Sequence, residues 1–181
     1  PPRRAVSMPG RLLVVIDIQK EYQAAGRAYH ITGVETSLAN AKRVLAHARK
    51  SGWPIMHVKH LQDGDLFGKT SPFSEYITGF EPLAGEAQYV KGDYSCYSSP
   101  EFAERLKRHL PDEVVVIGYG STKCCLATIV DGYHRGQKFL FVADASAAKR
   151  SEAFDESSLH AHATDILAGY CQLTKTAALT A

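Results

Sequence analysis

Two continuous apolar runs of strand length, Leu12–Ile16 and Val114–Ile117, constrain the fold of this chain more than any other feature. Neither run alternates with polar residues, as a strand with one face in water would. Such runs are typical of parallel strands that helices cover on both faces. Shorter strands are predicted at Ile55–Lys59, Gln88–Val90, Phe139–Ala143 and, as an edge strand, Gln172–Thr176.

Segments with helical periodicity separate these strands. Helices are predicted over Glu35–Lys50, Ser99–Leu110, Lys123–Arg135 and Ser151–Ala168. The alternation of strands and helices predicts an α/β fold with a mainly parallel, six-stranded sheet and right-handed crossovers. In such sheets ligands bind beyond the carboxyl ends of the strands.

The length of 181 residues suits one domain, predicted over residues 11–181, whereas residues 1–10 lack apolar periodicity and are predicted to form a flexible tail. A net charge of +2 gives no electrostatic basis for binding nucleic acid or a membrane, so the expected partner is a small molecule.

No apolar stretch is long enough to span a membrane, and no charged segment followed by an apolar one opens the chain. We therefore expect a cytoplasmic protein. A domain of this size does not need disulfides, so its four cysteines are predicted to be reduced.

Three residues with chemically reactive side chains follow predicted strands. Asp17 comes directly after the first apolar run, Lys91 follows a shorter strand, and Cys124 begins a helix behind a turn that contains Gly120. Together they suit a nucleophile, a base and an orienting charge, and the helix start favours a thiolate. Separately, a cysteine can be a small core residue and a lysine a solvated surface residue.

Three segments carry a family resemblance. Leu13–Tyr22 resembles the opening strand and Asp-x-Gln-x-x-aromatic signature of the isochorismatase-like cysteine hydrolase superfamily, Tyr89–Tyr97 its lysine segment, and Gly118–Thr128 its nucleophile segment. Order and spacing agree over roughly Arg11–Thr176. The superfamily includes nicotinamidases and carbamoylsarcosine, ureidoacrylate and biuret amidohydrolases.

The resemblance implies a three-layer αβα domain with Rossmann-like topology and a catalytic triad. Cys124 would be the nucleophile, Asp17 the general acid and base, and Lys91 the cation that orients Asp17 and lowers the thiol pKa. It also implies a non-proline cis peptide between Tyr119 and Gly120, with the N–H groups of Gly120 and Cys124 forming an oxyanion hole. The resemblance further implies that the enzyme needs no cofactor. It also implies a homo-oligomer, either a dimer or a tetramer.

Departures from the family pattern concern the pocket and the metal. Thr122 stands where many members carry aspartate, and Cys96 where a small residue is frequent. His57 and His60 would point to opposite faces of a strand, and His160 and His162 diverge on a helix and are expected to be solvated. The chain is therefore predicted to bind no metal and to belong to the metal-free amidohydrolase branch.

Candidate substrate-binding residues lie near the ends of the motifs: Gln23, His60, Phe67, Tyr94, Tyr97, Tyr119 and Thr122. The loop of residues 62–85 carries several aromatic residues, which suit either a pocket lid or packing of the loop onto the domain. Gln19 and Tyr22 are expected to serve in loop hydrogen bonding and packing rather than in catalysis.

The sequence thus predicts a cysteine hydrolase that cleaves a C–N bond of a small amide, carbamoyl or ureido compound through a thioester. Two alternatives remain open. One is isochorismatase, in which Asp17 serves an enol-ether hydrolysis that needs no thiol. The other is a non-catalytic binding protein on the same scaffold.

Overall fold

A computed structural model describes residues 10–109 and 111–181. Apart from Gly10, the predicted N-terminal tail lies outside the described residues. The strands are β1 (Arg11–Ile16), β2 (Ile55–His60), β3 (Ala87–Lys91), β4 (Glu113–Tyr119), β5 (Phe139–Ala147) and β6 (Gln172–Thr174). The α-helices are α1 (Val34–Lys50), α2 (Pro100–His109), α3 (Cys124–His134), α4 (Glu156–Leu167) and α5 (Thr176–Leu179), and the 3₁₀-helices are η1 (Lys20–Tyr22), η2 (Pro72–Ser74) and η3 (Cys96–Ser98).

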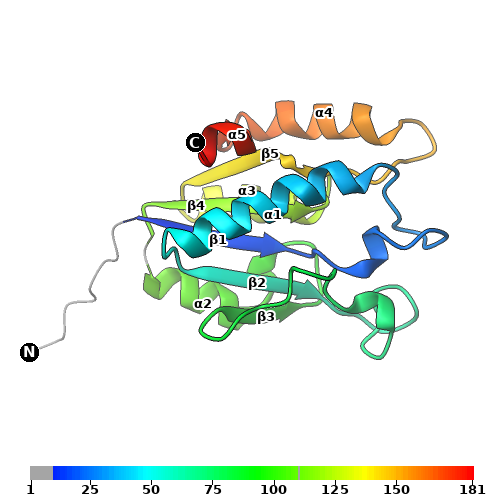
Figure 1. Cartoon of the computed structure of the whole chain (residues 1–181), viewed down its shortest axis with the longest axis horizontal. Coiled ribbons are helices and arrows are strands. Elements are labelled where there is room, and N and C mark those ends of the chain that lie inside the picture. The colour runs from blue at the N-terminus through cyan, green and yellow to red at the C-terminus, as the bar shows by residue number, and fades with distance from the viewer. Residues whose placement is uncertain (1–9, 110) are drawn as a thin grey trace, which may run out of the picture.

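The six strands form one sheet in the order β3-β2-β1-β4-β5-β6 (Figure 1). Every pair of neighbouring strands is parallel. The predicted α/β fold is therefore confirmed, and the sheet that was expected to be mainly parallel is parallel between all its described strands. The carboxyl ends of the strands consequently meet at one edge of the sheet.

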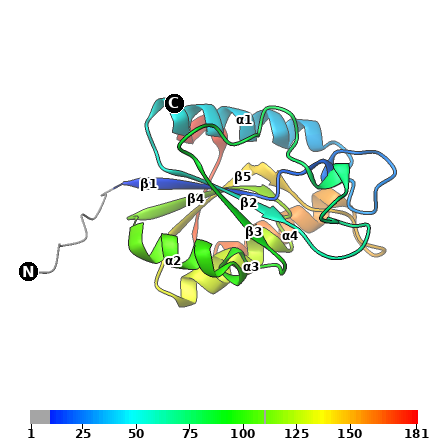
Figure 2. The ribbon, with the colours of Figure 1, turned by 90° about the horizontal axis from the view of Figure 1, so that it is seen from below.

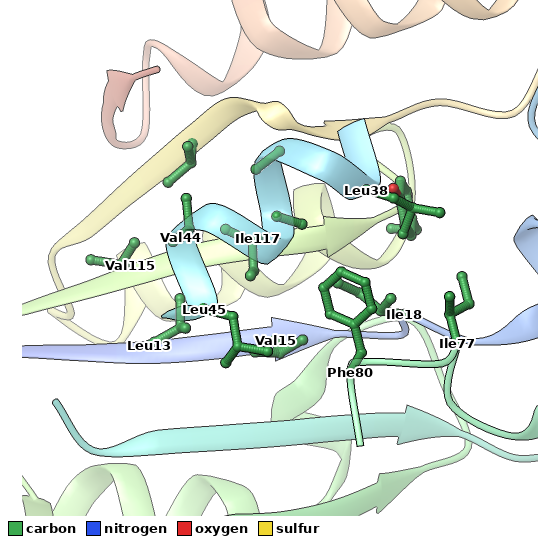
Figure 3. Packing of buried hydrophobic residues seen from close by; sticks show 14 of the residues in the cluster. Leu13, Val15, Ile18, Leu38, Val44, Leu45, Ile77, Phe80, Val115 and Ile117 are labelled. Carbon is green, nitrogen blue, oxygen red and sulfur yellow. The ribbon is translucent and has the colours of Figure 1, made fainter. Parts of the chain in front are cut away.

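Helices cover both faces of the sheet, with α1 and α5 on one side and α2, α3 and α4 on the other (Figure 2). The central strands alternate their side chains between two apolar clusters. Leu13 and Val15 pack with α1 residues such as Val44 (Figure 3), whereas Leu12 and Val14 pack on the opposite face. This double burial explains why the run Leu12–Ile16 contains no polar residue.

β4 and β5 continue well beyond their predicted ends, whereas β2 and β3 extend only to His60 and Lys91. β4 includes Gly118 and Tyr119, which the sequence placed in a break, and β5 passes Asp144 and ends at Ala147. A register shift between Val116 and Gly118 accompanies this extension. Gly118 and Asp144, which suggested strand ends, therefore lie within an irregular stretch of the pairing between β4 and β5.

The C-terminal helices also differ from the prediction. Asp155 caps α4 by accepting a hydrogen bond from the backbone N–H of Ser158, so the helix begins at Glu156 rather than at Ser151. β6 ends at Thr174, and Thr176 begins the short helix α5, which was not predicted.

Gly118, in the last part of β4, lets this strand pass close to β1. Its φ is +117°, and a Cβ atom there would lie 1.9 Å from the carbonyl oxygen of Ile16. A side chain at this position would therefore clash with backbone and strain its own conformation.

We predict that Gly118→Ala lowers the free energy of unfolding by about 3 kcal/mol or more, because strain and a backbone clash act together. Gly136→Ala is the matched control, since Gly136 has a φ of +81° and open space around it. It should cost only about 1 kcal/mol. Urea unfolding midpoints measure both values, and equal losses would refute the close-approach explanation.

Candidate active site

Three buried polar side chains meet at the carboxyl edge of the sheet. Asp17 directly follows β1, Lys91 is the last residue of β3, and Cys124 is the first residue of α3. Their exposed fractions are 0%, 1% and 5%. The Lys91 Nζ atom lies 2.9 Å from Asp17 Oδ2 and 3.3 Å from Cys124 Sγ. The structure thus brings together the three residues that the sequence singled out.

The Lys91 ammonium group has four neighbouring acceptors. Besides Asp17 and Cys124 these are the carbonyl oxygen of Asp93 at 3.0 Å and Nδ1 of His60 at 3.1 Å. Because the ammonium only donates, His60 Nδ1 accepts, and the ring donates its Nε2 proton to Gln62 Oε1 at 2.9 Å. Burial disfavours the charged lysine, but the Lys91 pKa is raised, and the neighbouring Asp17 carboxylate is the largest cause of that rise.

The Asp17 carboxylate offers one oxygen for chemistry. Oδ2 pairs with Lys91, whereas the buried Oδ1 has no hydrogen-bond partner among the described residues. The Asp17 backbone has a φ of 49°, an uncommon conformation that aspartate tolerates better than most residues. Its N–H donates to the carbonyl of Val58, and its carbonyl accepts from the N–H of Gln19.

Gln19 locks this turn to β2. Its side-chain amide donates to the carbonyls of His60 and Ser74, and its amide oxygen accepts from the His60 N–H. Gln19 is fully buried. The predicted role of Gln19 in loop hydrogen bonding is therefore confirmed.

The surroundings of Cys124 favour the protonated form of its thiol. Burial raises its pKa most, the Asp17 carboxylate raises it further, and Lys91 opposes both without reversing them. The expected lowering of the thiol pKa by Lys91 is therefore found in direction, but it is smaller than the opposite effects of burial and Asp17. Any attack by sulfur must be coupled to loss of the thiol proton.

The segment before the nucleophile presents free backbone donors. The Tyr119–Gly120 peptide bond is cis. The Gly120 carbonyl accepts from the N–H groups of Lys123 and Cys125, whereas the N–H groups of Gly120 and Cys124 have no acceptor among the described residues. Two unpaired donors beside a nucleophile suit an oxyanion hole.

A pocket of about 290 Å³ opens above the thiol. Three of the predicted substrate-binding residues, His60, Phe67 and Tyr94, line it. It is also lined by the catalytic candidates Asp17 and Cys124 and by Tyr22, Tyr29, Gln62, Gly92, Asp93 and Lys123.

The other predicted substrate-binding residues lie elsewhere, because their side chains leave the motif in other directions. Gln23 is exposed to solvent, and Thr122 lines a neighbouring surface hollow. The Tyr97 ring packs edge-on against Phe102 of α2. Tyr119 is fully buried under α1, where its hydroxyl lies 2.7 Å from Ser37 Oγ.

Tyr22 and Tyr29 are the aromatic pocket residues that were not predicted to bind substrate; Gln62, Gly92, Asp93 and Lys123 were not predicted either. The packing expected of Tyr22 is found, and its ring also lines the pocket, where it contacts Phe67 at a centroid distance of 5.5 Å. The aromatic position of the Asp-x-Gln-x-x-aromatic signature was the signal for it. Tyr29, from the loop after η1, has no motif that marks it.

The long loop between β2 and β3 contributes to both the pocket and the core. Phe67 adopts a φ of 51°, and its N–H donates to the buried Glu21 carboxylate, which Arg27 binds through two nitrogens. Phe80 and Ile77 pack into the cluster under α1 (Figure 3). The loop is therefore packed onto the domain while Phe67 forms a pocket wall.

The histidines have separate environments. His57 is buried and bonds Glu86 at 2.7 Å, and His60 lies at the site, so the expected divergence of these two residues is found. His162 is exposed as expected, but His160 is partly buried and bonds Ser121 and Ala143, which corrects the solvated interpretation. The described residues contain no group of three or more His, Cys, Asp or Glu side chains arranged to hold a metal ion.

All four cysteines are free, in agreement with the prediction of reduced thiols. Within the described residues, every helix is too short or too polar to cross a membrane.

A parallel sheet covered on both faces, with a thiol, a carboxylate and an ammonium group at its carboxyl edge, defines an enzyme domain of the α/β class. Residues 11–176 match the Isochorismatase domain family. The chain belongs to this family of hydrolases.

Similar proteins agree with this assignment. The chain is 30% identical to an uncharacterized isochorismatase family protein of Bacillus subtilis over 147 residues, 80% of this chain and 81% of the relative. It is 24% identical to maleamate amidohydrolase of Pseudomonas putida over 156 residues, 77% and 73% of the two chains. The crystal structure of an isochorismatase from Pseudomonas putida KT2440 matches with a TM-score of 0.86 and 28% identity, covering 98% of this chain and 92% of that chain. The predicted family and fold are confirmed.

The raised pKa of Cys124 predicts how the rate of its alkylation by iodoacetamide depends on pH, because iodoacetamide reacts with the thiolate. In a Cys171→Ser background, which removes the most exposed thiol, modification of Cys124 should keep rising above pH ~8.5, the ordinary thiol pKa. Asp17→Asn removes a charge that raises the Cys124 pKa, so alkylation at pH 7 should become faster, by roughly tenfold.

Asp93→Asn is the matched control for Asp17→Asn, because Asp93 lines the same pocket but is not a source of the Cys124 shift. It should leave alkylation unchanged. A wild-type rate that reaches its plateau below pH 7 would contradict the protonated resting state.

Proposed function

We propose that this protein is a cysteine amidohydrolase that cleaves the C–N bond of a small amide, carbamoyl or ureido compound through a thioester on Cys124, without a cofactor. The observation that carries the proposal is the position of Lys91 Nζ, which contacts both Asp17 and Cys124 at the floor of the pocket. A nucleophile, a proton acceptor and a fixed charge are the groups that acyl transfer needs.

The first chemical step follows from the protonation states. As Cys124 Sγ attacks the carbonyl carbon, the thiol proton passes to the free Oδ1 of Asp17. The negative charge that develops on the carbonyl oxygen is met by the N–H groups of Gly120 and Cys124. Lys91 keeps its proton throughout and holds Asp17 by the other oxygen.

The remaining steps return the site to its starting state. Asp17 gives its proton to the departing nitrogen, and ammonia or an amine leaves with the C–N bond broken. Asp17 then removes a proton from water, which attacks the thioester. The acid product departs, and the Cys124 thiol regains its proton.

The pocket restricts the substrate to a small molecule. A volume of about 290 Å³ lies at the lower end of the range for ligand sites, and the rings of Tyr22, Tyr29 and Phe67 form part of its wall. The similarity to maleamate amidohydrolase supports a small amide as the substrate. Isochorismatase activity, an enol-ether hydrolysis driven by Asp17, is the competing proposal, supported by the similarity to a structure of that name.

We predict that the purified protein releases ammonia from at least one member of a panel of maleamate, small carbamoyl compounds and ureides. Cys124→Ala should lower this turnover by on the order of 1,000-fold or more, because the nucleophile is lost. Cys125→Ala is the control, since this neighbouring thiol is buried and does not line the pocket. Its turnover should persist.

Two outcomes would overturn the proposal. Undiminished ammonia release by Cys124→Ala would remove the thioester. Hydrolysis of isochorismate that survives Cys124→Ala but not Asp17→Asn, with no amide turned over, would establish the competing activity.

A further inference from the structure

His160 of α4 reaches the segment that precedes the nucleophile from the side away from the pocket. Its Nδ1 lies 2.8 Å from Ser121 Oγ, and its Nε2 lies 2.8 Å from the carbonyl oxygen of Ala143 in β5. A carbonyl only accepts, so Nε2 carries a proton and donates it. Burial lowers the His160 pKa more than the Ala143 carbonyl raises it, so the ring is neutral near pH 7 and Nδ1 accepts from the Ser121 hydroxyl.

Ser121 is held on two sides as a result. Its side chain is fully buried and bonds His160, while its N–H donates to the carbonyl of Ala147 at 2.9 Å. It directly follows Gly120, one of the two proposed oxyanion donors. The position of Ser121 therefore sets where the Gly120 peptide lies.

The residue on the other side of Gly120 is anchored as well. The Tyr119 hydroxyl lies 2.7 Å from Ser37 Oγ, and Ser37 donates its own proton to the Val34 carbonyl, so Tyr119 is the donor. Ser37 belongs to α1 and His160 to α4, which lie on opposite faces of the sheet (Figure 2). Two helices thus fix the residues that flank Gly120.

We propose that His160 is a positioning residue for the hydrolysis, which orients the donors of Gly120 and Cys124 by holding Ser121; this rests on the proposed function. His160 does not touch the substrate, because it lines a separate groove between α1 and α4 rather than the pocket. Its loss should therefore weaken stabilisation of the transition state and leave substrate binding intact.

The test uses His160→Ala, which removes both hydrogen bonds, and His162→Ala, an exposed histidine two residues along the same helix. With the best amide of the panel, His160→Ala should lower kcat by on the order of tenfold, the value of about one hydrogen bond, and leave KM unchanged. His162→Ala should leave both constants unchanged. His160→Asn, which keeps an acceptor near the position of Nδ1, should recover most of kcat.

Ser121→Ala distinguishes positioning from general support of the fold. If His160 acts through Ser121, kcat should fall to the same extent in His160→Ala and in Ser121→Ala. The variant that carries both changes should be no slower than either one. Thermal melting of each variant gives the stability change separately.

The positioning role would be overturned, and the proposed function left intact, if the wild type turns over the amide and His160→Ala keeps the wild-type kcat. This holds whether or not the melting temperature of His160→Ala falls. Losses that add in the double variant would show that His160 does not act through Ser121. Absence of amide turnover by the wild type would remove the proposed function and this role with it.

Discussion

The buried ion pair between Lys91 and Asp17 is the interaction on which the rest of the structure depends. The two residues are 74 positions apart in sequence; Lys91 ends β3, Asp17 directly follows β1, and β2 lies between these two strands in the sheet. Two charges removed from water are costly unless their remaining hydrogen-bonding groups are also satisfied. Here β2 supplies His60, and the chain after β3 supplies the Asp93 carbonyl. The parallel order of the strands is what allows this cluster to form.

The same pair influences Cys124, the proposed nucleophile. Lys91 lies 3.3 Å from the thiol sulfur, but burial and the neighbouring carboxylate keep the Cys124 proton in place. With Oδ2 occupied by Lys91, the unpartnered Oδ1 of Asp17 is the acceptor that remains. The site therefore stores a neutral thiol beside a base instead of a reactive thiolate. Such a thiol is protected from adventitious oxidation, which follows thiolate character.

Much of this arrangement could be predicted from the sequence because it follows from strand ends. Continuous apolar runs mark central parallel strands, and Asp17 and Cys124 follow such runs in a sheet whose carboxyl ends must share one edge. The ends of β4 and β5 were less predictable, because the register shift beside Gly118 is a tertiary effect. Helix and turn propensities do not report how far a strand continues after its pairing becomes irregular.

Other residues differ from the prediction, each for its own reason. Tyr97 and Tyr119 lie within recognisable motifs, but their rings turn toward helices and not toward the pocket, Tyr97 toward Phe102 of α2 and Tyr119 toward Ser37 of α1. The net direction of the Cys124 pKa could not be predicted from Lys91 alone, because burial, the larger effect, depends on the folded surroundings. His160 was read as solvated because its partners, Ser121 and Ala143, come from other elements.

The claim that these groups form one acyl-transfer site is tested most directly by acid-quenched, intact-mass spectrometry during turnover of an amide. We expect a mass increase equal to the acyl group, mapped by digestion to Cys124 and absent in Cys124→Ala. In the proposed mechanism Asp17 supplies the proton for the leaving nitrogen, so Asp17→Asn should fail to accumulate this adduct even though its thiol is alkylated faster. An enzyme that turns over the amide with no adduct on Cys124, or with an adduct undiminished in Asp17→Asn, would contradict the account.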